Sequence, residues 1–278
     1  METSALRNAL EALHEKAPLV HNITNYVTVN DCANALLAIG ASPIMSDEPK
    51  DVVDITSICN ALTLNIGTLN QQSIKAMFEA GERAATLGHQ IVLDPVGAGA
   101  SKLRTDTASD LLDCLPITVI RGNMSEARAL SGAAATTRGV DVCPDDVVTR
   151  GNLAESVRFA RELAGQTATV VAITGPIDIV ADADKAYAVF NGSPLQGKIT
   201  GTGCMLSCIC AAYVAANPQA LLEGTLAAVV HMGLAGEMAA KRLSPAEGTG
   251  TFRAYLIDAL NRMDAETLVA GAKVEELA

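Results

Sequence analysis

The sequence predicts an α/β fold in which a mainly parallel β-sheet is flanked by helices and carries an antiparallel edge hairpin. Short apolar runs rich in β-branched residues recur along the chain and end in Gly, Asn or Asp, at 61–67, 90–97, 117–123 and 169–175. Segments with helical periodicity lie between them, and the segment 178–192 has the pattern of a hairpin. A repeated strand, helix, strand order indicates a parallel sheet with right-handed crossovers.

The first element is an amphipathic helix within residues 1–19. Leu6, Leu10 and Leu13 share one helical face, and charges are spread through the segment, so it lacks the apolar core of a secretion signal. We therefore expect a cytoplasmic protein that begins with a helix.

The central elements are strands alternating with helices. The four apolar runs lack clean alternation of apolar and polar residues, which is typical of strands covered on both faces. Helices are expected between them, at 71–88 and 153–165. In 178–192, two short runs flank the polar tripeptide Asp182-Ala183-Asp184, which predicts antiparallel strands at one edge of the sheet.

The last third of the chain, after Gly203, is expected to be mainly helical to its end. The most apolar stretches are 204–216, which is too short to span a bilayer, and 221–240, which is interrupted by Glu223, His231 and Glu237. Both are interpreted as buried helices. Because no Ser-rich or Pro-rich linker divides the sequence, we expect one domain over residues 1–278.

Composition excludes several classes of partner. The chain has 278 residues and 49% hydrophobic content, enough for a sizeable core. Its net charge is -11, with 20 Lys and Arg against 31 Asp and Glu, so we expect neither nucleic acid nor a membrane surface as partner. Seven cysteines, an odd number, indicate free thiols in a reducing compartment.

Polar residues at the ends of the predicted strands carry the candidate chemistry, because ligands of an open parallel sheet collect beyond the carboxyl ends of its strands. Asp94 precedes a loop with two glycines, and Arg121 lies close to Asn123 and Glu126. Arginine suits phosphate oxygens, and a carboxylate with its waters suits Mg²⁺. Two alternatives stay open: a strand-terminating turn after Asp94, and a helix start capped by Asn123 and Glu126.

The stretch Gly201-Thr202-Gly203 comes directly before an apolar helix. Backbone N–H groups of such a turn converge on one point, where the helix dipole also favours negative charge, so the stretch predicts a nest for a transferring phosphoryl group. Cys204 follows at its mouth. A thiol at a helix start has a lowered pKa and could accept a proton from a substrate hydroxyl, although a neighbouring polyanion opposes this, and a small buried residue is the alternative.

Six ordered motifs resemble hydroxyethylthiazole kinase, and the likeness covers roughly residues 5 to 265. They are VHNITNYVTVNDCANALLAIGASPIMS (20–46), ALTLNIGTL (61–69), VLDPVGAGAS (92–101), VIRGNMSEA (119–127), VAITG (171–175) and ITGTGCMLS (199–207). The resemblance implies a ribokinase-like three-layer sandwich and ATP-dependent, Mg²⁺-requiring phosphorylation of 4-methyl-5-(2-hydroxyethyl)thiazole in thiamine salvage. It also implies a homotrimer with active sites at subunit interfaces.

The same resemblance implies roles for individual residues. The nucleotide side consists of Arg121, Thr174, Asp94 and Asn123. The residues implied to contact the thiazole are Met45, Gly201, Asn25, Val27 and Gly67. Asp94 and Glu126 match the acidic positions that organise Mg²⁺. Gly201, Thr202 and Gly203 match the anion hole, and Cys204 stands where most ribokinase-like relatives outside this branch carry a catalytic Asp.

Three other functions remain as alternatives. A kinase of another small alcohol, such as hydroxymethylpyrimidine, would share the fold. A dehydratase acting on damaged nicotinamide cofactors would also share it, but its usual Asp is missing at Cys204. A sensor that binds without turnover is disfavoured by the intact set of Asp94, Arg121 and Glu126. His21 is interpreted as a hydrogen-bonded structural residue.

Overall fold

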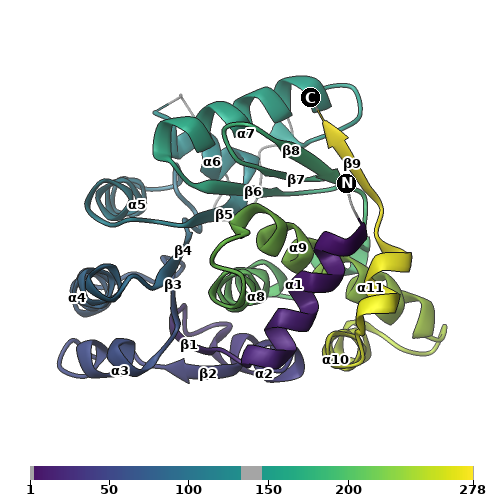
Figure 1. The fold of residues 1–278 in the computed structure, drawn as a ribbon, viewed down its shortest axis with the longest axis horizontal. Helices are drawn as coiled ribbons and strands as arrows, with labels where there is room; N and C mark the ends of the chain where they lie inside the picture. The colour runs from purple at the N-terminus through teal and green to yellow at the C-terminus, as the bar shows by residue number, and fades with distance from the viewer. Residues whose placement is uncertain (1–2, 133–145, 278) are drawn as a thin grey trace.

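The computed structural model describes residues 3–132 and 146–277. In this part of the chain, nine strands form one sheet in the order β2-β1-β3-β4-β5-β6-β7-β8-β9 (Figure 1). Strands β1 to β6 pair in parallel, and β7, β8 and β9 are added antiparallel at one edge. The bounds are β1 Leu19–Ile23, β2 Ser42–Met45, β3 Ala61–Asn65, β4 Gln90–Asp94, β5 Val119–Asn123, β6 Val170–Thr174, β7 Asp178–Ala181, β8 Ala186–Val189 and β9 Val274–Leu277.

Helices cover both faces of the sheet and give three layers (Figure 1). One face carries α3 (Val52–Ile58), α4 (Gln71–Leu87), α5 (Lys102–Cys114), α6 (Met124–Leu130) and α7 (Leu153–Thr167). The other carries α1 (Thr3–Lys16), α2 (Val29–Ala38), α8 (Thr202–Ala216) and α9 (Leu221–Arg242). Two further helices, α10 (Thr249–Asn261) and α11 (Ala265–Gly271), pack against α9.

The predicted fold class is confirmed, and the structure adds three strands. The four apolar runs became β3, β4, β5 and β6, and the expected hairpin is β7 with β8. The additional strands β1 and β2 lie within residues 19–45, where the sequence pattern predicted no strand. The expectation of helix to the chain end is wrong for 274–277, because these residues pair with β8 and close the edge of the sheet as β9.

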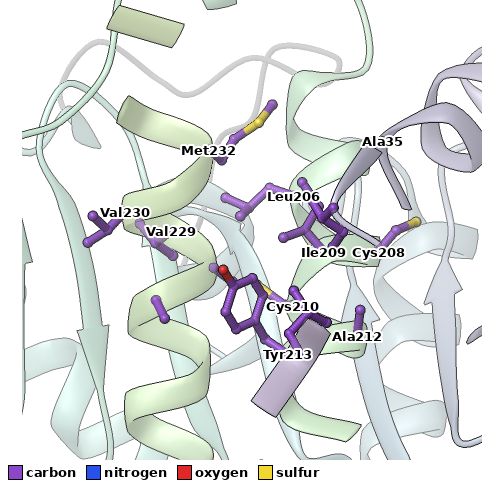
Figure 2. Close-up of a cluster of buried hydrophobic side chains, with 14 of the residues drawn as sticks. Ala35, Leu206, Cys208, Ile209, Cys210, Ala212, Tyr213, Val229, Val230 and Met232 are labelled. Atoms are coloured by element: carbon purple, nitrogen blue, oxygen red, sulfur yellow. The ribbon is translucent and has the colours of Figure 1, made fainter. Parts of the chain in front are cut away.

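Helices α8 and α9 form the centre of the largest hydrophobic cluster, which confirms their interpretation as buried helices (Figure 2). Leu206 of α8 lies beside Val229 and Met232 of α9. A buried polar pair between these helices is satisfied: His231 Nε2 is 3.0 Å from the Leu260 carbonyl, so it donates there, and its Nδ1 accepts from Tyr213 Oη at 2.8 Å. Burial lowers the pKa of His231 to about 4.

Two smaller expectations concern thiols and membranes. The described cysteines, which are Cys32, Cys59, Cys114, Cys204, Cys208 and Cys210, are free, and Cys143 lies outside the described residues. Among the helices in the described ranges, none has the length and apolar character needed to cross a bilayer.

Candidate active site

Parallel pairing brings the carboxyl ends of β3, β4, β5 and β6 to one edge of the sheet. Asn65 is in register with Asp94, and Asn123 with Thr174. The Asn65 amide donates to Asp94 Oδ2 at 2.7 Å, so strand pairing places neighbouring polar side chains in direct contact. The expected line of functional groups along this edge is therefore present.

The glycine-rich turn at the start of α8 faces this edge. Gly201 has a φ of +88°, which a residue with a side chain rarely adopts, and a Cβ there would lie 2.7 Å from the Thr28 methyl group. The first hydrogen bond of the helix runs from Met205 N to the Gly201 carbonyl, so the N–H groups of Thr202, Gly203 and Cys204 precede the helical ladder. These three N–H groups are the ones that the predicted anion nest would use.

Arg121 occupies the space next to this nest. It is 9% exposed, its Nη2 donates to Thr174 Oγ1 at 2.5 Å, and its Nη1 lies 3.6 Å from Asp94 Oδ2. A Cβ on Gly203 would come within 2.5 Å of Arg121 Nη1, so the missing side chain makes room for the guanidinium. The nest and the cation therefore meet at one point, which suits a group carrying several negative charges.

Asp94 is fully buried, and one of its two carboxylate oxygens has hydrogen-bond partners. Its Oδ2 accepts from Asn65 Nδ2 and from Ser207 Oγ, both at 2.7 Å. Within the described residues, its Oδ1 has no hydrogen-bond partner. Burial raises the pKa of Asp94, and Arg121 opposes that shift.

The unused Asp94 oxygen is the observation that fits Mg²⁺. This cation binds through one or two carboxylates and takes its other ligands from water and phosphates. No cluster of three or more His, Cys, Asp or Glu able to hold a metal occurs in 3–132 or 146–277, so an all-protein cage is not what these residues form. Asp94 suits a metal that arrives with a nucleotide.

Glu126 is held by the backbone. Its Oε1 accepts from Gly97 N and its Oε2 from Asn123 N, both at 2.8 Å, while Asn123 Oδ1 accepts from Glu126 N at 2.9 Å. The helix-capping alternative is thus confirmed as the local geometry of Asn123 and Glu126. Burial and the nearby Asp94 raise the pKa of Glu126 to about 7. The carboxylate ties the loop after β4 to the start of α6.

Cys204 corrects one expectation. Burial and the neighbouring Asp94 raise its pKa to about 11, so the lowered pKa expected at a helix start is wrong for this thiol. Its sulfur accepts from Asn25 Nδ2 at 3.2 Å, and the same amide reaches Asn65 Oδ1 at 3.1 Å. Loss of hydration on folding outweighs the helix dipole at this position.

A cleft of about 500 Å³ opens on one side of the nest. Arg121, Thr174, Thr202 and Gly203 line its polar end. The other walls are the segment Phe190–Gly197 and the α9 residues Val229, Met232 and Gly233. One charged end and one apolar wall match what a nucleotide presents, namely phosphates and a base.

A second, smaller cavity of about 140 Å³ lies at the ends of β1, β2 and β3. Met45, Asn22 and Asn65 are among its lining residues. Of the five predicted thiazole contacts, Met45 lines this cavity, and Asn25, Val27, Gly67 and Gly201 do not. Val27 is 56% exposed, and Gly67 packs where a Cβ would meet Asn25 and Asn65 at 3.0 Å. Asn65 lines this cavity and its Oδ1 accepts from the amide that reaches Cys204, while Gly203 lines the large cleft, so both cavities adjoin the Cys204 region.

Several residues at the site were not singled out from the sequence. Asp178 lines the large cleft, accepts from Gly175 N at 2.8 Å, and has its pKa raised to about 7 by burial. Arg104 donates to the Val96 and Gly67 carbonyls, which joins two loops of the site. No spacing in the sequence marks these residues, because the Arg104 contact with the Gly67 carbonyl joins segments distant in the chain and the position of Asp178 in the cleft depends on the packed fold.

His21 has the structural role expected of it. The side chain is buried, with Nδ1 2.9 Å from Thr56 Oγ1 and Nε2 2.9 Å from the Ser46 carbonyl. Because a carbonyl only accepts, Nε2 carries the proton. Burial lowers the pKa of His21 and favours this neutral form.

Comparison with known proteins places the chain among kinases. The family model described as "Hydroxyethylthiazole kinase family" matches residues 10–266. A hydroxyethylthiazole kinase of Clostridium acetobutylicum is 51% identical over 97% of this chain and 99% of its own length. The structure of a hydroxyethylthiazole kinase protein from Pyrococcus horikoshii OT3 superposes with a TM-score of 0.87 at 37% identity, covering 99% of this chain and 100% of that one. A ribokinase-like superfamily protein from Enterococcus faecalis shares the fold, with a TM-score of 0.59 at 14% identity over 94% of this chain and 96% of its own. The chain belongs to the hydroxyethylthiazole kinase family.

Proposed function

We propose that this protein transfers the γ-phosphoryl group of ATP to the hydroxyl of 4-methyl-5-(2-hydroxyethyl)thiazole, a reaction of thiamine salvage. Besides family membership, one observation carries the proposal. The nest at Gly201–Gly203, the Arg121 guanidinium and the unsatisfied Asp94 carboxylate meet where the large cleft adjoins the Cys204 region. A phosphate donor on one side and an alcohol on the other would then face each other across the anion nest.

The nucleotide is assigned to the large cleft. Its base would lie against the apolar wall of Val229 and Met232, and its phosphates would reach Arg121 and Thr174. Phosphoryl transfer needs alignment and charge neutralisation more than covalent chemistry. The N–H groups of the nest and the fixed guanidinium provide both without reorganising during the reaction.

The alcohol is assigned to the cavity beside Met45. This side chain offers a polarizable contact to a small sulfur heterocycle, and the amides of Asn22 and Asn65 in the same lining are neutral hydrogen-bonding groups. Gly201 lets the nest pack against Thr28, since a side chain there would collide with it. The hydroxyl would then point at the nest.

Cys204 orients this hydroxyl as a neutral thiol. With a pKa of about 11, roughly one molecule in 10⁴ carries a thiolate at pH 7. Proton removal by Cys204 is therefore weak, and alignment carries most of the rate. As the hydroxyl oxygen bonds to the γ-phosphorus, the bond between that phosphorus and the ADP oxygen breaks, and the hydroxyl proton passes to an oxygen of the transferred phosphoryl group.

Mg²⁺ is assigned to Asp94, whose free oxygen would hold it directly or through water, with Glu126 fixing the neighbouring loop. When bound, the cation neutralises charge on the phosphate oxygens. Two neighbouring residues keep Asp94 and Glu126 in place. Arg121 stays paired with Asp94, and Asn123 accepts a hydrogen bond from Glu126 N at the end of β5.

We also propose a homotrimer and a cytoplasmic location. Tyr26 and Val27, at the mouth of the alcohol side, are 79% and 56% exposed, and Leu37 on α2 is 57% exposed. These apolar side chains near the edge strand β2 support a subunit interface that would complete the site. The free thiols of the described cysteines support a reducing compartment.

A coupled assay of ADP release tests the proposal. We expect turnover with the thiazole alcohol, and slower turnover with hydroxymethylpyrimidine. Faster ADP release with hydroxymethylpyrimidine would favour the alternative alcohol kinase. Absence of thiazole-dependent ADP release from folded protein that binds both ligands would favour a sensor.

A further inference from the structure

Helix α9 is almost entirely apolar where it crosses the molecule, yet Glu237 lies on it with only 10% of its side chain exposed. Its Oε1 accepts from Asn191 Nδ2 and from Gly192 N, both at 3.1 Å, and its Oε2 accepts from Lys273 Nζ at 2.7 Å. Burial opposes its ionisation, but the Lys273 contact and the N–H donors outweigh it and lower the pKa of Glu237. The carboxylate is therefore charged at neutral pH.

The residues held by Glu237 form one wall of the large cleft. Asn191 and Gly192 line it and lead into the 3₁₀ helix Pro194–Lys198, which lines it further. The Asn191 side chain is used completely: its amide also donates to the Gly271 carbonyl at 2.9 Å, and its oxygen accepts from Lys273 N at 2.8 Å. The wall is thus anchored at its first residues.

The wall also lies unusually close to α9. A Cβ on Gly233 would lie 2.8 Å from Asn191 Cβ, and one on Gly236 would lie 2.2 Å from Gln196 Oε1. Gln196 Nε2 donates to the Met232 carbonyl at 3.2 Å. Gly233, Gly236 and Glu237, on consecutive turns of α9, therefore all contact the same loop. This close packing restricts the movement of the wall.

From these contacts we infer that Glu237 is a positioning residue for the nucleotide, which sets the Asn191–Gln196 wall of the cleft without touching the substrates. The inference rests on the proposed function, because it takes the cleft as the ATP site. The wall ends at the nest, where Thr202 Oγ1 donates to the Gln196 carbonyl at 3.2 Å. The cavity beside Met45 shares no lining residue with the wall.

The effect is expected on ATP and not on the alcohol. Glu237→Ala leaves Gly192 N and one Asn191 proton without their acceptor. We expect KM for ATP to rise about ten-fold, the loss typical of one charge-assisted hydrogen bond. The thiazole KM should stay within about two-fold, since the alcohol cavity lies beyond the nest. A matching loss of affinity for a non-hydrolysable ATP analogue should appear in calorimetric titration.

Two companion variants make the result specific. Glu223→Gln changes the same residue type on the same helix, away from the cleft, and should leave both KM values unchanged. Lys273→Met keeps the Glu237 carboxylate and the backbone contacts of residue 273 with Asn191 and Phe190, so we expect less than a two-fold change in the ATP KM. If Glu237→Ala unfolds, Glu237→Gln, which keeps one acceptor oxygen, is expected to give a smaller rise of the same kind.

The outcomes separate the inference from the proposed function. An unchanged ATP KM in a folded Glu237→Ala variant overturns the inference, as does an equal rise in Lys273→Met, which would assign the effect to the chain terminus. A rise in the thiazole KM alone also overturns it. Failure of the unmodified protein to bind the ATP analogue or to phosphorylate the thiazole would instead contradict the proposed function.

Discussion

Gly203→Ala adds one methyl group and tests whether the Arg121 guanidinium must lie directly against the glycine turn at the start of α8. The new Cβ would lie 2.5 Å from Arg121 Nη1, 2.8 Å from Nη2 and 3.0 Å from Cζ. Ordinary contact begins near 3.4 Å, so the guanidinium must retreat by about 0.9 Å. Arg121 is buried and its Nη2 is 2.5 Å from Thr174 Oγ1, so this retreat breaks that contact and misdirects the charge.

The size of the effect follows from the contact that is lost. A hydrogen bond from a charged group contributes about 1.5 to 3 kcal/mol, which corresponds to a drop in kcat of roughly 10- to 150-fold. The measurement is kcat and KM by coupled ADP release, with the melting temperature as a check on folding. Gly203→Val should abolish turnover.

Gly250→Ala is the matched control for this substitution. Both glycines are the second residue of a helix, in α8 and α10 respectively, and a Cβ on Gly250 meets nothing within 4 Å. The control should keep full activity, because alanine is accepted in a helix and fills open space. A Gly203→Ala enzyme with kcat within two-fold of the unmodified protein would refute the reasoning that Arg121 must lie against the nest.

Three further substitutions probe charge and protonation at other points. Asp94→Asn should lower Mg²⁺-dependent turnover by about 10²-fold, or about 2.7 kcal/mol, with thiazole affinity by titration nearly intact; equal loss of both would indicate a structural role. Cys204→Asp should retain or raise kcat, because a carboxylate is a better base than a thiol whose pKa is about 11; an inactive but folded variant would contradict the base position. Burial lowers the pKa of His231 from 6.5 in the unfolded chain to about 4 in the folded protein. Its contribution to the free energy of unfolding is therefore complete above pH 6.5, and up to about 3 kcal/mol of it is lost as the pH falls through 4. In melting curves between pH 8 and 4, His231→Gln should therefore lose less stability than the unmodified protein, and an identical pH dependence would show that His231 does not carry it.

Local sequence patterns were sufficient for the elements that carry a continuous apolar run or a cap formed by nearby residues. The runs that became β3 to β6 are apolar because both of their faces are covered, and Asn123 with Glu126 caps α6 through contacts only three residues apart. The φ of Gly201 agrees with a turn that needs glycine. Strands β1 and β9 lack such a run: their sequences, Leu-Val-His-Asn-Ile and Val-Glu-Glu-Leu, mix polar or charged residues with apolar ones.

The sequence by itself determined the parallel α/β architecture, the strand ends that carry Asp94, Arg121 and Thr174, and the glycine turn before α8. The tertiary structure alone decided how these groups act. It buried Cys204 and so raised a pKa that a helix start would lower, and it left one Asp94 oxygen without a partner among the described residues. It also brought Glu237 of α9 to the loop after β8. Solvation and contacts between distant segments depend on the packed whole, and a local pattern does not contain them.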